Sequence, residues 1–132
     1  MKERGVHFIQ RKRGVLKGWI LKFNKTAARP GEGYANIVKC RDGVVEGIVY
    51  EIEESDLSKL DVYEGYPKHY TRIEVEVEVK GKKLKAVTYV ANPNKVKDGL
   101  KPSKHYLKRL LKGCNLLSKE YCEMLRNIET LD

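Results

Sequence analysis

The chain has 132 residues, of which 41% are hydrophobic and 34% charged, and its formal net charge is +9. This length and balance indicate one globular domain that is able to bury its own core. No apolar run reaches the ~18 residues that cross a bilayer, and no signal peptide opens the chain, so we expect a cytoplasmic protein without membrane contact.

Positive charge is concentrated at the start of the chain. Residues 1–30 contain nine Lys or Arg and a single acid, Glu3. Such a block can attract nucleic acid or an acidic partner, but no nucleic-acid motif accompanies it, so nucleic-acid binding is not favoured. Lys and Glu dominate the charged residues and Gln10 is the only glutamine, a bias typical of heat-adapted proteins.

The cysteines and histidines indicate neither a metal site nor a disulfide framework. Cys40, Cys114 and Cys122 show no Cys-x-x-Cys spacing, and the three histidines are scattered. We therefore expect buried or inert thiols, with Cys122 on the apolar face of a helix.

The first half of the chain predicts strands. Apolar side chains occupy both faces of 14–24, which indicates a central strand, whereas residues 1–13 carry no convincing pattern. A glycine-rich turn at 26–33 follows. Two more strands are expected at 34–40 and 44–52, joined by a hairpin at Asp42-Gly43.

The second half predicts one hairpin and three helices. Strands at 69–79 and 83–91 flank Lys-Gly-Lys, and glutamates of one arm face lysines of the other. Ser55 is the expected N-cap of a short helix, Lys-Pro-Ser opens a second at 101–112, and Ser118 caps the last. Five strands and three helices indicate an α+β domain on a mixed, mainly antiparallel sheet.

A lone acid, Glu64, lies where the first helix meets the long strand. Three tyrosines surround it in the sequence, and a Gly and a Pro end the helix beside it. An acid held there beside aromatic rings can be desolvated enough for proton transfer. The alternative is a solvated loop glutamate.

Six stretches stand out in the order in which a known family carries them. They are Leu-Lys-Gly-Trp-Ile-Leu-Lys-Phe-Asn-Lys (16–25), Arg-Pro-Gly-Glu-Gly-Tyr-Ala-Asn-Ile-Val (29–38), Val-Glu-Gly-Ile-Val-Tyr-Glu-Ile (45–52), Leu-Asp-Val-Tyr-Glu-Gly (60–65), Thr-Tyr-Val-Ala (88–91) and Lys-Pro-Ser-Lys-His-Tyr (101–106). Together they resemble the gamma-glutamylcyclotransferase-like family. The resemblance implies a small barrel-like sheet with flanking helices and a cavity that holds one glutamate.

The resemblance also implies an activity and a site. Members of the family cyclise gamma-glutamyl amines to 5-oxoproline and release the amine or amino acid, without a metal or organic cofactor. Glu64 matches the catalytic glutamate. Tyr70, Tyr89 and Tyr106 match tyrosines that line its cavity, and Ala35 lies in the strand that passes it. The expected partner is a small gamma-glutamyl molecule.

One feature of the family is missing from the sequence. The family begins with a strand that ends in Tyr-Gly-Ser-Asn, and residues 1–132 contain no such stretch. We expect either a start further upstream or a protein that has lost this loop and its catalysis. A missing strand would leave an open sheet edge and favour a homodimer.

Three functions follow from these residues. The first is intramolecular aminolysis, in which the substrate's α-amine attacks its own γ-carbonyl and Glu64 moves the proton. The second is an inactive member of the family that binds an acidic partner or nucleic acid through its basic first third. The third is an enzyme that acts on another amide, with the cavity reshaped around Glu64.

Overall fold

A computed structural model describes residues 8–132. The elements in chain order are β1 (Phe8–Thr26), β2 (Gly33–Ile52), α1 (Glu54–Glu64), β3 (Tyr70–Val79), β4 (Lys82–Ala91), the short helix η2 (Pro93–Lys95), α2 (Lys104–Leu111), η3 (Lys112–Asn115) and α3 (Lys119–Arg126). The strands form one sheet in the order β2-β1-β3-β4, and all three pairs are antiparallel. The predicted α+β class with an antiparallel sheet and flanking helices is confirmed.

β1 is the inner strand that the apolar pattern predicted, and it is longer than expected. Leu16 is buried against Val77 and Val79 of β3, and these three side chains form the core of the sheet. The charged stretch before Gly14 showed no strand pattern, yet Arg11 pairs with β2 and keeps its side chain exposed. Backbone pairing with β2 therefore extends the strand where side-chain burial gives no signal. The expectation for residues 1–7 lies outside the described part of the chain.

β2 is one continuous strand, so the predicted hairpin at Asp42-Gly43 is wrong. Lys17 of β1 pairs with Val44 of β2, and Trp19, only two residues further along β1, pairs with Lys39, five residues back along β2. The extra residues of β2 form a bulge rather than a turn. A Cβ at position 43 would lie 2.5 Å from the backbone oxygen of Trp19, so only glycine fits at this close approach.

The hairpin of β3 and β4 is confirmed. Its turn places Lys80 at φ 51 and Gly81 at φ 80, the left-handed pair that a two-residue hairpin loop requires. Glu76 faces Lys83 across the strands at 3.7 Å, as the sequence predicted. Both side chains are more than half exposed, so this pair adds little stability.

The cap predicted at Ser118 is confirmed for α3, and Ser103, which the sequence placed at the start of a helix, also caps α2. The Ser103 hydroxyl accepts from the Tyr106 N–H at 3.0 Å, and the Ser118 hydroxyl accepts from the Tyr121 N–H at 3.2 Å. The predicted cap Ser55 is wrong, because α1 already begins at Glu54 without a side-chain cap. β2 ends at Ile52, so the chain enters α1 almost directly from the strand.

Two of the cysteines differ from the prediction of free thiols. Cys114 in η3 and Cys122 in α3 form a disulfide, and Cys40 is the free cysteine. Cys122 is 3% exposed, so its predicted place in the core is confirmed. Their spacing matches no disulfide or metal motif, and the bend between α2 and α3 brings them together.

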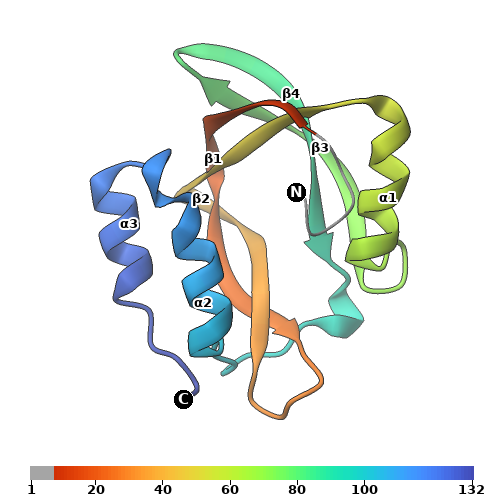
Figure 1. Cartoon of the computed structure of the whole chain (residues 1–132). Coiled ribbons are helices and arrows are strands. Elements are labelled where there is room, and N and C mark those ends of the chain that lie inside the picture. The colour runs from red at the N-terminus through yellow and green to blue at the C-terminus, as the bar shows by residue number, and fades with distance from the viewer. Residues whose placement is uncertain (1–7) are drawn as a thin grey trace.

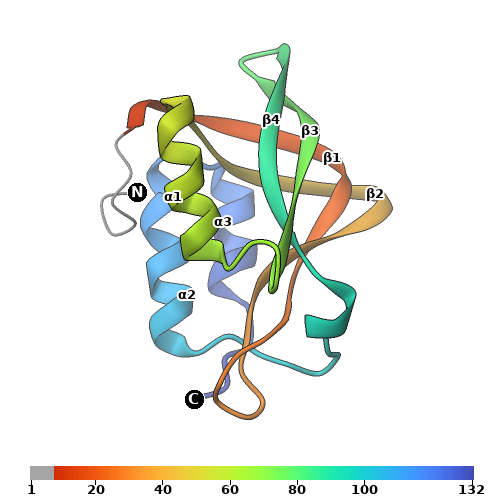
Figure 2. The ribbon, with the colours of Figure 1, turned by 90° about the vertical axis from the view of Figure 1, so that its right-hand side faces the viewer.

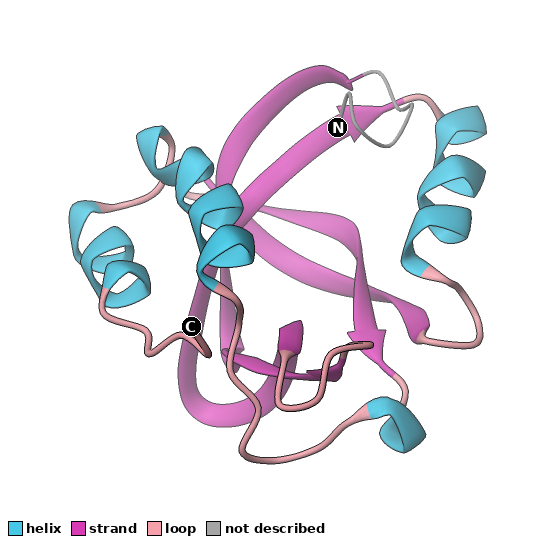
Figure 3. Cartoon of the chain, turned by 60° about the horizontal axis from the view of Figure 1, so that its bottom comes forward, coloured by secondary structure: helices cyan, strands magenta, loops and turns pink. Residues whose placement is uncertain are grey.

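The helices lie on two sides of the sheet. α2 and α3 lie next to each other, and α1 lies across the strands from them (Figures 1 and 2). The sheet curls so that its edge strands meet at one end, where the Asn36 side chain on β2 accepts from the Ala91 N–H on β4 at 2.8 Å. Figure 3 shows this curvature. No helix in the described part of the chain is both long and apolar enough to cross a membrane.

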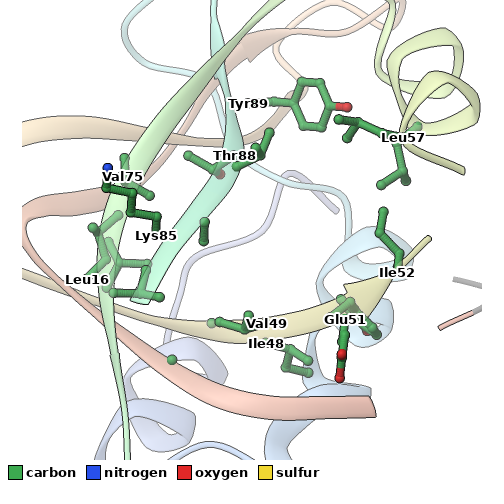
Figure 4. Close-up of a pocket in the computed structure, with 18 of the residues that line it drawn as sticks. Leu16, Ile48, Val49, Glu51, Ile52, Leu57, Val75, Lys85, Thr88 and Tyr89 are labelled. Carbon is green, nitrogen blue, oxygen red and sulfur yellow. The ribbon is translucent and has the colours of Figure 1, made fainter. Parts of the chain in front are cut away.

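The edge strands diverge at the other end of the sheet. There an apolar cavity of about 510 Å³ lies between residues 45–52 of β2 and residues 85–89 of β4, and side chains of α1 also line it. Figure 4 shows Val49 and Ile52 on one wall, and Leu57 and Tyr89 on another. This cavity is distinct from the one that holds Glu64.

Candidate active site

Glu64 is the last residue of α1, at the turn that the sequence predicted. Gly65 follows at φ 70 and ends the helix, and its N–H donates to the Val62 carbonyl oxygen at 3.2 Å. A Cβ at Gly65 would lie 2.7 Å from a ring carbon of His69. The turn therefore needs glycine both for its conformation and for its packing. The half-buried Glu64 side chain faces a cavity there.

This cavity, which we call the Glu64 cavity, has a volume of about 380 Å³. It is of the size that holds small ligands in proteins. Among the described residues that line it, Glu64 is the one carboxylate. The lining residues are Lys25, Tyr34, Tyr63, Glu64, Gly65, His69, Tyr70, Tyr106 and Arg109.

Tyr70 and Tyr106 are held by the backbone of Ala35. The Tyr70 hydroxyl donates to the Ala35 carbonyl oxygen at 3.3 Å, and the Ala35 N–H donates to the Tyr106 hydroxyl at 3.1 Å. A bulge makes this backbone accessible, because two residues of β1, Phe23 and Asn24, oppose Ala35 alone. Ala35 thus acts through its peptide groups, which fix two phenol rings beside Glu64.

The protonation states of the cavity follow from its surroundings. Burial, reinforced by Tyr106, Glu64 and Tyr34, raises the pKa of Tyr70, so its hydroxyl remains a donor at neutral pH. The nearby ammonium of Lys25 is the largest cause that lowers the pKa of His69. His69 is therefore neutral at pH 7, and Lys25 and Arg109 carry the positive charge of the lining.

Tyr89 lies outside the lining of the Glu64 cavity. Its ring faces the apolar cavity between β2 and β4 (Figure 4). Its hydroxyl donates to Asp61 at 2.6 Å, and Asp61 also pairs with Arg72 at 2.7 Å. The structure thus brings Glu64, Tyr70, Tyr106 and the Ala35 backbone together, and ties Tyr89 to the preceding turn of α1.

Four lining residues were not predicted from the sequence: Lys25, Tyr34, His69 and Arg109. Lys25 carried the clearest signal, because it follows Asn24 as a polar pair at the end of an apolar strand. Arg109 carried none, since it lies on α2, far from Glu64 in sequence. Within residues 8–132 no three His, Cys, Asp or Glu side chains come close enough to hold a metal ion.

The basic first third of the chain does not form a uniform patch. Lys17 pairs with Glu78 at 3.5 Å, Arg29 lies 3.6 Å from Glu32, and Lys25 is buried. An acid of β3 and an acid of the adjacent turn therefore offset part of the charge that the sequence places there.

Comparisons with known proteins identify the family of this chain. The family model described as "Gamma-glutamyl cyclotransferase, AIG2-like" matches residues 2–108. The Drosophila melanogaster protein CG2811, which carries a provisional gamma-glutamylcyclotransferase name, is 49% identical over 45 residues, or 34% of this chain. That match spans only 23% of the fly protein.

Solved structures share the fold over nearly the whole chain. One named "Gamma-glutamyl cyclotransferase" is 28% identical, with a TM-score of 0.82 over 92% of this chain and 75% of its own. YkqA from Bacillus subtilis is 27% identical, with a TM-score of 0.84 over 98% of this chain and 50% of its own. The family predicted from the six sequence stretches is confirmed. With a family model that covers most of its length, the chain belongs to the gamma-glutamyl cyclotransferase, AIG2-like family.

Proposed function

We propose that this protein converts a gamma-glutamyl amine or peptide into 5-oxoproline and a free amine. The observation that carries the proposal is the Glu64 cavity, in which one carboxylate lies among phenol rings held in place by Ala35. Membership of the gamma-glutamyl cyclotransferase, AIG2-like family supports the same reaction.

The reaction is an intramolecular aminolysis. Glu64 takes a proton from the substrate's α-ammonium, and the freed amine attacks the γ-carbonyl carbon to close a five-membered ring. The bond from that carbon to the leaving nitrogen then breaks as Glu64 returns its proton to that nitrogen. The ring nitrogen still carries one proton more than 5-oxoproline needs, and Glu64 passes this second proton to the released amine, which leaves as an ammonium. No atom of the protein becomes bonded to the substrate, and the proton balance is zero.

The cavity contributes mainly by shaping the substrate. Effective molarities for well-oriented ring closures reach about 10⁵ M or more, so a folded glutamyl chain supplies much of the rate. The rings of Tyr34 and Tyr106, whose centroids are 5.2 Å apart, form a rigid wall against which the chain can fold. The Tyr70 and Tyr106 hydroxyls add polar contacts at the same wall.

Replacement of the glutamate tests the proposal. We expect Glu64→Gln to lower the rate of 5-oxoproline formation by at least about 100-fold, because an amide side chain cannot act as a base. A loss of this size lies within the range that general acid-base groups contribute. A panel of gamma-glutamyl dipeptides and gamma-glutamyl amines, with 5-oxoproline measured by chromatography, provides the assay. It also separates this reaction from hydrolysis of another amide, which would release no 5-oxoproline.

The matched control is Glu120→Gln on α3, a carboxylate outside the cavity lining. Both variants should show the circular dichroism spectrum and the melting temperature of the parent protein. Unchanged turnover in Glu64→Gln would remove Glu64 from the mechanism.

A further inference from the structure

Lys25 is a buried cation that forms no ion pair with the residues that the structure describes. Its residue is 5% exposed, and its ammonium donates to the backbone oxygen of its neighbour Thr26 at 2.8 Å. Within the described residues, no carboxylate lies within ion-pair distance of that ammonium. Lysine is almost never fully buried unless it is paired, because an uncompensated charge is costly to remove from water.

The position of Lys25 is fixed from both sides. Its backbone pairs with Tyr34 on β2 and forms a bridge with Val96 beyond η2. The ammonium lies 5.6 Å from the ring centre of Tyr70 and 6.0 Å from that of Tyr34. Cation-π contacts of this kind hold a charge above a ring but leave it able to bind an anion. The charge is therefore placed at the Glu64 cavity before any ligand arrives.

The charges around Lys25 favour an anionic ligand. Burial and the nearby Lys95 both lower the pKa of Lys25, which means that these surroundings disfavour its charged form. Arg109 lines the same cavity, and among the lining residues that the structure describes Glu64 is the one acid. A bound carboxylate would offset the charge of Lys25.

We propose that Lys25 binds the α-carboxylate of the gamma-glutamyl group. The inference rests on the proposed function and deepens it, because it restricts the substrates to those with a free α-carboxylate. The α-carboxylate and the α-ammonium share one carbon atom. A cation that holds the carboxylate therefore limits where the amine can lie, and it orients the amine toward Glu64 in the same cavity.

A double comparison of ligand and protein tests this contact. 5-Oxoproline keeps the α-carboxylate, whereas 5-oxoprolinamide carries an uncharged amide of nearly the same shape. We expect the parent protein to bind 5-oxoproline about 10- to 100-fold more tightly than the amide, the range of a charge-assisted hydrogen bond. In Lys25→Met the two ligands should bind alike, as measured by isothermal titration calorimetry.

The control variant is Lys22→Met, an exposed lysine of the same strand that does not line the cavity. It should keep the full preference for 5-oxoproline. Methionine fills most of the volume of lysine and carries no charge, so Lys25→Met should melt at or above the temperature of the parent protein.

The outcomes separate this inference from the proposed function. A Lys25→Met variant that still binds 5-oxoproline more tightly than the amide overturns the inference. A parent protein that binds the two ligands equally well overturns it as well. If 5-oxoproline binds through Lys25 but no substrate is turned over, the inference stands and the proposed reaction fails. If the parent protein turns over substrate without this preference, the reaction stands and the inference fails. If it neither binds 5-oxoproline nor forms it, both fail.

Discussion

A single buried amide, Asn36, joins three segments next to the Glu64 cavity. Its side-chain N–H₂ donates to Asn24 on β1 at 3.0 Å, and its oxygen accepts from the Ala91 N–H on β4 at 2.8 Å. Asn36 is 6% exposed. Because Ala35 is its neighbour in β2, the same contacts set the backbone that holds Tyr70 and Tyr106.

We predict that Asn36→Ala lowers the free energy of unfolding by about 2–3 kcal/mol, because it leaves the Asn24 oxygen and the Ala91 N–H buried without their partner. Urea denaturation at neutral pH measures this change. Asn94→Ala, an exposed asparagine of η2, should stay within about 0.5 kcal/mol of the parent protein. A loss below that margin for Asn36→Ala would mean that the amide does not hold the strands together.

Residues of the site were predictable from the sequence where their position depends on local structure. Glu64 follows from a helix that must end at Gly65, and the tyrosines beside it follow from the same short stretch. Lys25 and Ala35 depend instead on the bulge at the end of β1 and on which strand lies opposite. Those are long-range pairings, so the polar pair Asn24-Lys25 marks the end of an apolar strand in the sequence but not the cavity that this end reaches.

The disulfide is the strongest link between the last two helical segments. Cys114 and Cys122 are eight residues apart and tie η3 to α3, whose Leu125 is also buried. In the chain-entropy model, a closed loop of this length lowers the entropy of the unfolded chain and thereby stabilises the folded protein by about 2–3 kcal/mol. The helices therefore depend on the redox state of the protein for part of their stability.

We predict that reduction with a small thiol lowers the free energy of unfolding by about 2–3 kcal/mol, because the unfolded chain regains its freedom. Urea denaturation with and without reductant measures the difference. Cys40→Ser keeps the disulfide and should respond to reductant like the parent protein, whereas Cys114→Ser should not respond. Equal stability of the reduced and oxidised proteins would contradict the prediction.

Helices and turns were predicted correctly where the residues that determine them are close together in the sequence. The β3–β4 turn, the Lys-Pro-Ser opening of the second helix and the Ser118 cap of α3 were predicted from a few neighbouring residues. The two-strand prediction for 34–52 was wrong, because Asp-Gly is a turn signal only when the flanking strands pair with each other. Here both flanks pair with β1, so the same residues form a bulge.

At the scale of the whole molecule, the sheet is closed at one end and open at the other. β2 and β4 are the edges of the described sheet, and they meet at Asn36 and Ala91. Toward residues 45–52 of β2 they separate around the apolar cavity (Figure 4). The pattern of predicted elements indicated the fold class, and the family resemblance implied a barrel-like sheet. Neither showed where the sheet would be open, because that depends on the paths of two strands far apart in the chain.

We predict that this apolar cavity accepts an added β-strand. The resemblance implies a strand that ends in Tyr-Gly-Ser-Asn, and edge strands that flank an apolar cavity can pair with an extended peptide. A synthetic peptide of alternating valine and polar residues that ends in Tyr-Gly-Ser-Asn should therefore raise the melting temperature and the rate of 5-oxoproline formation.

A scrambled peptide of the same composition is the control, and neither quantity should change with it. A second copy of the chain is the competing occupant, and sedimentation would then show a dimer that the peptide dissociates. Val87 on β4 lines the cavity and is 46% exposed, so Val87→Lys should weaken either occupant by placing a charge in the apolar lining. If the peptide changes neither stability nor association, the open end of the sheet is not a strand-binding site.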